Sequence, residues 1–187
     1  EAVWSAAGKD FNNYTLSGSG GQDDPYLIQS EWDLAYLSWT IYTNHPIEAS
    51  HVSSSWYYYS GIYFEQTADL DLSAYYWQPI GIVFLRDGTS ASRYFSGCYD
   101  GGGHIVSGVF TPAGTGYGYS YQGLFGYVRG QSTTNLATIS NVGVIDSFVQ
   151  GYEYVGGVVG MAYYCDILNC YNTGSVSGNN YVGGIVG

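Results

Sequence analysis

Two nearly identical heptapeptides decide the fold: residues 154–160 read YVGGVVG, and residues 181–187 read YVGGIVG, 27 positions later. A shorter relative, GLFG at residues 123–126, aligns with residues 157–160 at an offset of 34. We expect the additional residues of that longer spacing in the polar stretch 129–135. Self-similarity at a fixed period is typical of repeat proteins, in which each copy is one structural unit.

A second repeated block lies between these heptapeptides. The sequence ISNVGV at residues 139–144 matches ILNCYN at residues 167–172, and GSVSG at residues 174–178 corresponds to residues 146–151. Each block is a short strand with alternating apolar side chains, bounded by Gly or Asn, which tolerate positive φ at a corner. One such unit cannot bury its apolar face alone, whereas stacked copies share a continuous core.

The repeats therefore predict an all-β fold, a parallel β-helix (β-solenoid) in which successive coils pair strand on strand about 4.8 Å apart. Ile139 and Ile167 should stack inside it, and Asn141 and Asn169 should form a ladder at a turn. A β-propeller blade needs about 40 to 45 residues, and a β-sandwich lacks a fixed period of this kind. The repeat itself does not set the handedness of the coil.

The beginning of the chain carries a helix signal. Ser30 precedes an apolar stretch at residues 31–37, and Asp33 completes a variant capping box three residues later. We expect a short helix there that covers the end of the strand stack, because unpaired strand edges need cover. Residues 38–60 are irregular and aromatic, and we interpret them as an insertion or a long loop. Strands should resume at residues 62–66.

A length of 187 residues suits one domain with a substantial core. We interpret it as one β-solenoid domain with four parts: an N-terminal cap (1–37), the insertion (38–60), the first coils (61–122) and the glycine-rich repeats (123–187). The last repeat stops at Gly187, where another coil should stack. We therefore expect a truncated repeat array that continues in a longer protein.

Several segments, taken in order, resemble GLUG-motif proteins. They are PYLI (25–28), DLAYLS (33–38), YFEQTADLDLS (63–73), WQPIG (77–81), FSGCYDGGGHIVSGV (95–109), GLFGYV (123–128) and the two heptapeptides. The resemblance implies a right-handed parallel β-helix with a short N-terminal capping helix. It also implies a secreted or surface-anchored bacterial protein, either adhesin-like or a non-catalytic part of an immunoglobulin A peptidase. The repeat motif is structural, so the resemblance carries over no catalytic residue.

Charge argues against several classes of partner. The chain has four basic and fifteen acidic residues, and its formal net charge is −11. Such a surface repels phosphate backbones, so nucleic-acid binding is disfavoured. No run of about 18 apolar residues is present, so we expect no membrane insertion in this segment. An extracellular or cell-surface location is what the resemblance to GLUG-motif proteins implies.

Few residues suggest chemistry. Asp69 and Asp71 would share one face of a strand, as calcium ligands or paired glycosidase carboxylates do. The plainer interpretation is a structural segment in which Leu70 and Leu72 point inward. The three His are far apart and no HExxH motif occurs, so a zinc peptidase centre is absent from this sequence. We predict no catalytic residue and no cofactor, with calcium at Asp69 and Asp71 as the one open candidate.

The three cysteines are too few for a disulfide scaffold. Buried free Cys behaves as a small hydrophobe, and this is the favoured interpretation for Cys98, Cys165 and Cys170. A Cys165–Cys170 bridge stays open, because its geometry cannot be judged from the sequence.

Aromatic clusters are the best ligand-binding candidates. Trp56, Tyr57, Tyr58 and Tyr59 lie in the expected insertion, and rigid amphipathic rings suit sugars or partner proteins. The alternative is that such rings form cross-strand ladders that stabilise sheets. Further clusters occur at residues 75–77, 117–121 and 163–164.

These observations favour a non-catalytic, extracellular adhesin-like or spacer module of a cell-surface protein, with a glycan or a host surface protein as partner. Two alternatives stay open: an accessory region of a secreted immunoglobulin A peptidase-like enzyme, and a β-helix enzyme that degrades polysaccharides. The oligomeric state is not predicted.

Overall fold

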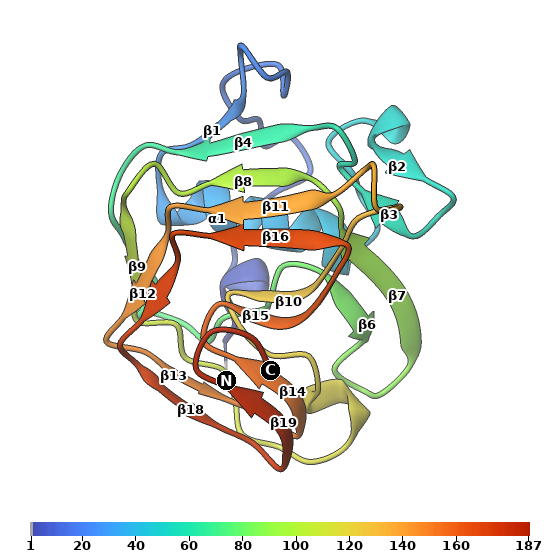
Figure 1. Ribbon diagram of the computed structural model, residues 1–187. Helices are drawn as coiled ribbons and strands as arrows, with labels where there is room; N and C mark the ends of the chain where they lie inside the picture. The colour runs from blue at the N-terminus through green and yellow to red at the C-terminus, as the bar shows by residue number, and fades with distance from the viewer. Residues whose placement is uncertain (1) are drawn as a thin grey trace.

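Short parallel strands make up most of the computed structural model, which describes residues 2–187 (Figure 1). The chain runs in successive circuits, and each circuit adds a strand to several sheets. In the second half, strands β10 to β14 of one circuit pair with β15 to β19 of the next, each in parallel. The all-β prediction with parallel sheets is therefore confirmed.

The largest parallel sheet has the strand order β1-β4-β8-β11-β16, seen one below another in Figure 1. Its strands are β1 (Tyr26–Ile28), β4 (Tyr63–Gln66), β8 (Cys98–Asp100), β11 (Ala137–Ser140) and β16 (Cys165–Leu168). One inward column runs through all five strands, with the side chains of Tyr26, Phe64, Tyr99, Ile139 and Ile167 in register. The stacking of Ile139 on Ile167 is thus confirmed.

The other sheets also contain strands from successive circuits. A second sheet has the main order β15-β10-β7-β3-β2: β15 (Val159–Tyr163), β10 (Phe125–Arg129), β7 (Ser90–Phe95), β3 (Tyr57–Tyr58) and β2 (Val52–Ser53), with β6 (Ile82–Phe84) paired to β7. A third has the order β17-β12-β9-β5: β17 (Tyr171–Asn172), β12 (Gly143–Ile145), β9 (Ile105–Ser107) and β5 (Leu70–Asp71). The two-stranded sheets are β13 (Phe148–Gln150) with β18 (Ser175–Ser177), and β14 (Glu153–Gly156) with β19 (Asn180–Gly183).

The pairing register reproduces the repeat alignment. Val155 pairs with Val182, and Val149 pairs with Val176, each 27 positions apart. The offset is 34 positions at the start of the circuit, where Phe125 pairs with Val159. By Ala137, which pairs with Cys165, it has fallen to 28. The extra residues therefore lie in a turn closed by the Ser132–Asn135 bridge, as the sequence predicts.

One corner of the coil carries the predicted asparagine ladder. Asn141 and Asn169 have φ of 55° and 52°, the left-handed conformation that Asn accepts more readily than most residues. The Asn169 side-chain amide donates to Asn141 Oδ1 at 3.2 Å, and Asn141 Nδ2 donates to Asp100 Oδ1 at 3.0 Å. The ladder thus reaches one circuit further back than expected.

Helix α1 (Glu31–Tyr42) begins as the sequence predicts. The backbone amide of Asp33 donates to the side chain of Ser30, the N-cap residue of α1, at 3.3 Å. The helix continues to Tyr42, so the interpretation of residues 38–42 as loop is wrong. Ser38, Thr40 and Ile41 are buried, and the Arg93 guanidinium donates to the carbonyls of Ile41 and Tyr42, where a cation is favourable.

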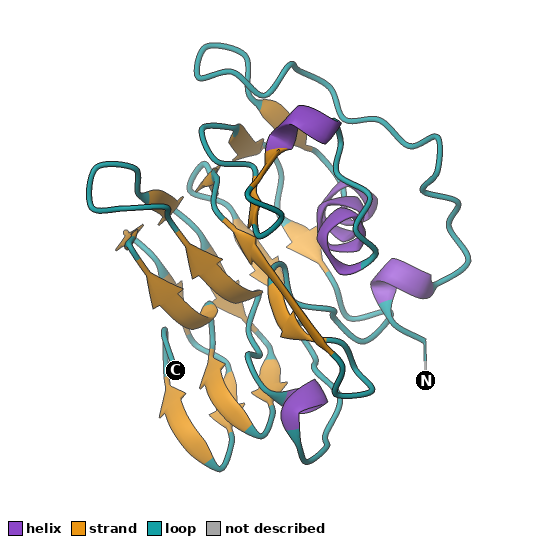
Figure 2. Ribbon diagram, turned by 90° about the vertical axis from the view of Figure 1, so that its right-hand side faces the viewer, coloured by secondary structure: helices purple, strands orange, loops and turns teal. Residues whose placement is uncertain are grey.

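The rest of the expected insertion is also structured. It contains the 3-10 helix η2 (Ala49–His51) and strands β2 and β3; further 3-10 helices are η1 (Trp4–Ala6) and η3 (Tyr117–Tyr119). Figure 2 shows α1 on the N-terminal side of the sheets, with the C-terminal strands on the opposite side. Over residues 2–187, no helix has the length and apolar character needed to cross a membrane.

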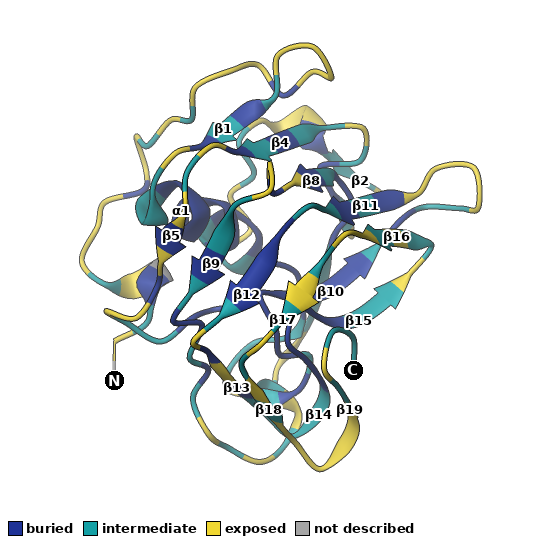
Figure 3. Ribbon diagram, turned by 60° about the vertical axis from the view of Figure 1, so that its left-hand side comes forward, coloured by how far each residue is buried: buried dark blue, intermediate teal, exposed yellow. Residues whose placement is uncertain are grey.

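Burial decreases toward the last circuit. The central strands β11 and β12 are largely buried, whereas β16 to β19 are half-buried or exposed (Figure 3). Leu168 in β16 is 51% exposed, while Ile139 in β11 is fully buried. The last circuit has a packing partner on one side only within the described residues.

The inner column yields a stability prediction. Ile139→Ala should lower the free energy of unfolding by about 2–5 kcal/mol, because it opens a cavity between two circuits. Leu168→Ala, in the neighbouring strand, should cost less than about 1 kcal/mol, because that side chain already lies half in water. Urea denaturation of the two variants measures the difference, and equal losses would contradict the inward column.

Candidate functional site

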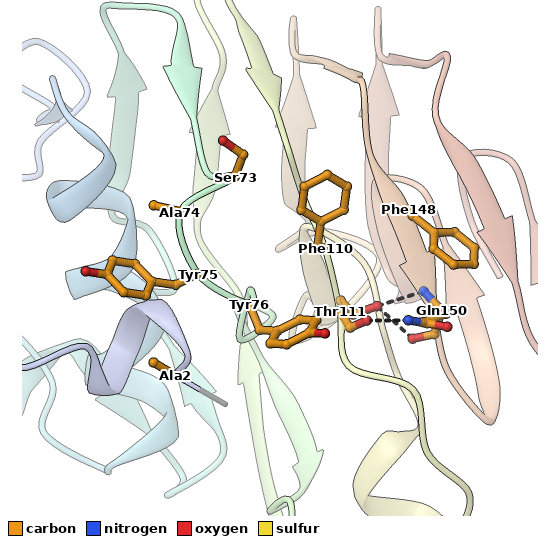
Figure 4. A pocket seen from close by; sticks show the side chains of 9 residues that line it. All are labelled: Ala2, Ser73, Ala74, Tyr75, Tyr76, Phe110, Thr111, Phe148 and Gln150. Carbon is orange, nitrogen blue, oxygen red and sulfur yellow. Dashed lines mark hydrogen bonds between the residues drawn. The ribbon is translucent and has the colours of Figure 1, made fainter.

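A shallow groove crosses neighbouring segments of the stack (Figure 4). Its volume is about 480 Å³. The side chains that line it are Ala2, Ser73, Ala74, Tyr75, Tyr76, Phe110, Thr111, Phe148 and Gln150. The segments come together because Phe110 forms a parallel bridge with Phe148, and the Trp77 amide donates to the Phe110 carbonyl at 2.7 Å.

The aromatic rings of the groove point outward because strand alternation places their neighbours inside. Val109 and Val149 are fully buried, whereas the adjoining Phe148 is 41% exposed and Phe110 is half-buried. The two Phe side chains therefore form an apolar floor across two successive circuits.

Two hydrogen-bonded polar residues, Thr111 and Gln150, line one end of the groove. Thr111 Oγ1 donates to the Gln150 carbonyl at 2.7 Å, and the Gln150 side-chain amide donates to the Thr111 carbonyl at 3.0 Å (Figure 4). In the part of the chain that the structure describes, Gln150 Oε1 has no hydrogen-bond partner. It is therefore a positioned acceptor at the edge of an aromatic floor.

No charged side chain lines the groove among residues 2–187. Aromatic faces offer rigid amphipathic area, and a small number of fixed polar groups orients a ligand. A neutral ligand with an apolar face and hydroxyl groups matches this chemistry. The polar groups that line the groove are uncharged, so they cannot neutralise a charged ligand.

A second aromatic feature stands at another corner of the coil. Tyr121, Tyr154 and Tyr181 stack as a column with ring centroids 4.7 and 4.6 Å apart. Their φ values are 59°, 55° and 53°, a conformation that costs a non-glycine residue of order 1 kcal/mol or more. Ring stacking between circuits offsets part of that cost. Burial, with a smaller effect of Tyr154, raises the pKa of Tyr121 to about 12.

The predicted cluster at residues 56–59 does not form one exposed surface. Trp56 is 48% exposed, but Tyr58 and Tyr59 are fully buried, and their hydroxyls bond to Asn44 and to Thr40 respectively. Tyr57 pairs with Tyr94 of the neighbouring strand, with ring centroids 5.7 Å apart. The alternative of a cross-strand ladder therefore describes Tyr57, and alternation along β3 turns Tyr58 inward.

The two candidate calcium ligands make separate local bonds. Asp69 Oδ1 accepts from the Ile105 amide and from the His104 ring, both at 3.1 Å, and these bonds lower the pKa of Asp69. Asp71 accepts from Ser73, which lowers its pKa. Leu70 and Leu72 point inward as predicted. Among the described residues, no three acidic, His or Cys side chains gather where they could hold a metal ion.

The three cysteines are free, half-buried thiols, so the bridge left open for Cys165 and Cys170 is not formed in this structure. Burial raises the pKa of Cys165 to about 12, and burial also raises the pKa of Cys98 and Cys170. Protonated thiols are poor nucleophiles. Their role here is packing.

The sequence interpretation missed the groove. Its rings come from three segments far apart in the chain, and only Tyr75 and Tyr76 stood in a recognised aromatic cluster. A signal was present in Phe148-Val149, two adjacent apolar residues in a short strand. Alternation buries one of such a pair and exposes the other.

Comparisons with known proteins support the resemblance found in the sequence. Residues 151–177 match the GLUG motif. Halomucin from Haloquadratum walsbyi is 29% identical over 175 residues, which covers 91% of this chain and 2% of halomucin. The fold is similar to that of a Bacteroides ovatus protein provisionally named an immunoglobulin A1 protease, with a TM-score of 0.54 and 20% identity over 90% of this chain and 46% of that one. The chain thus spans a small part of one relative and about half of the other.

The tyrosine column predicts alkaline sensitivity. Tyr121 has a pKa of about 12 in the folded chain and an ordinary value of 10.0, so the unfolded state loses its proton first as pH rises. Stability should be fully present below pH 10 and fall between about pH 10 and 12. In Tyr121→Phe this decline should be less steep. Urea denaturation at several pH values measures both slopes.

The control is the free energy of unfolding of the wild type and of Tyr121→Phe near neutral pH. That difference gives the effect of losing the hydroxyl itself, without its ionisation. Identical slopes above pH 10 would show that Tyr121 ionises equally easily in both states.

Proposed function

We propose that this chain is a non-catalytic module of an extracellular or cell-surface protein, built as a right-handed parallel β-helix that binds neutral glycans in its aromatic groove. The circuit-on-circuit pairing of β10 to β14 with β15 to β19 supports the β-helix. The match to the GLUG motif and the similarity to halomucin support a surface protein as its parent.

The groove is the observation that carries glycan binding. A sugar ring has apolar C–H faces and a rim of hydroxyls. Phe110 and Phe148 supply an apolar floor for the face, while Gln150 Oε1 and the hydroxyl of Tyr76 can meet the rim. The absence of charge among the described lining residues favours a neutral sugar over a charged one.

Catalysis is disfavoured by the acidic residues themselves. A glycosidase needs one carboxyl group whose pKa is raised, so that it can protonate the leaving oxygen. The pKa values of Asp69 and Asp71 are instead lowered by hydrogen bonds, and neither residue lines the groove. A polysaccharide-degrading role therefore has no acid to perform it at this groove.

A second candidate is an accessory region of a larger secreted peptidase. The similarity in fold to the Bacteroides ovatus protein favours it. The module would then hold or position the catalytic part, with a host protein as its partner. The full reading frame of the parent gene distinguishes the candidates, since a peptidase domain in the same chain favours the accessory role.

A glycan array tests the proposed function. The chain should bind one class of neutral glycan, and Phe148→Ala should weaken that binding about tenfold or more, as loss of a central aromatic contact does. Tyr181→Ala, an exposed ring outside the groove, is the matched control and should leave the affinity unchanged. Absence of any bound neutral glycan would reduce the module to a spacer.

A further inference from the structure

Arg129 ends strand β10 on the outer surface of the second sheet, among tyrosine rings. Its guanidinium carbon lies 5.1 Å from the ring centroid of Tyr163, 5.3 Å from that of Tyr94 and 5.8 Å from that of Tyr57. These rings come from β15 and β7, which lie on either side of β10, and from β3, the next strand beyond β7. At such distances the ring faces attract the cation and limit its contact with water.

The other two arginines of the chain use their guanidinium groups to hold the fold together. Arg86 donates to the Gly118 carbonyl at 3.1 Å, and Arg93 donates to the end of α1. The Arg129 guanidinium instead contacts tyrosine side chains, including the hydroxyl of Tyr127. Within residues 2–187 it has no carboxylate within 4.0 Å, and its Nε is buried without a hydrogen-bond partner.

This arrangement leaves a cation positioned but not neutralised. The chain carries a net charge of −11, yet none of its described carboxylates reaches Arg129. A guanidinium offers a planar fork of donors that fits a carboxylate in bidentate fashion. Flanking rings fix the plane of that fork, so less side-chain freedom is lost when an anion binds.

Two tyrosine rings, tilted by 56° to one another, lie in the segment that runs past Arg129. Tyr163 is 44% exposed, and its ring centroid lies 4.3 Å from that of Tyr164. Two adjacent rings give rigid amphipathic area next to the cation. A pyranose ring that carries a carboxylate would meet both parts, the apolar face on the tyrosines and the acid on the guanidinium.

We propose that Arg129, with Tyr163 and Tyr164, forms a second binding site, for the carboxylate of an acidic sugar such as a uronic acid. This site lies outside the aromatic groove and shares no residue with it. The proposal therefore goes beyond neutral-glycan binding and stands or falls independently of it.

Chemical-shift titration with glucuronate and with glucose tests the proposal, since these probes differ by one carboxylate. Glucuronate should bind and glucose should bind at least tenfold more weakly. Arg129→Gln should weaken glucuronate binding about tenfold or more, and Arg129→Lys should also weaken it, because the point charge lacks the fork. Added salt should raise the Kd.

Lys9→Gln is the matched control, because it removes one positive charge that also lies over aromatic rings, those of Tyr14 and Trp32. It should leave glucuronate binding unchanged, and so should Phe148→Ala in the groove. If Arg129→Gln fails to fold, Tyr163→Ala takes its place, since that residue is 44% exposed, and several-fold weaker binding is expected.

Three outcomes would overturn the proposal. Equal binding of glucose and glucuronate would show that the carboxylate is not recognised. Unchanged affinity in the Arg129 and Tyr163 variants would place any site elsewhere. Tighter binding of a polyglutamate peptide than of glucuronate would assign the surface to an acidic protein.

Discussion

Parallel pairing of each circuit with the next is the interaction on which the rest of this structure depends. A single circuit of two- to six-residue strands has no partner for its backbone N–H and C=O groups and no core of its own. Stacked circuits satisfy those groups and place equivalent side chains in columns. The inward columns form the core from Tyr26 to Ile167, and the outward columns become the surfaces that can meet a ligand.

Sequence alone predicted the repeating parts of the fold and the beginning of the helix. The offset between Tyr154 and Tyr181, the corner position of Asn141 and Asn169, and the N-cap at Ser30 depend on local patterns, and the structure confirms them. The extension of α1 to Tyr42 was missed because its stabilising partner, Arg93, is distant in sequence. The burial of Tyr58 and Tyr59 was missed for a related reason: a run of four aromatic residues does not reveal which of them alternation turns inward.

The candidate sites were less predictable than the fold. The groove assembles Tyr76, Phe110 and Phe148 from different circuits, and the site at Arg129 assembles tyrosines from three strands. Neither set is a motif along the chain, since the neighbours are set by the register between circuits. The two surfaces also differ in chemistry. One is neutral and hollow, and the other holds a cation on an open face, so they suit different ligands on one scaffold.

The connectivity of this scaffold has a mechanical consequence. Backbone bonds join each circuit to its neighbour, as in the pairing of β10 to β14 with β15 to β19. A load applied along the stack would separate the circuits one at a time. Each release of 27 residues would lengthen the chain by roughly 90 Å. In a protein under shear, such stepwise extension would absorb force while the circuits not yet released stayed folded.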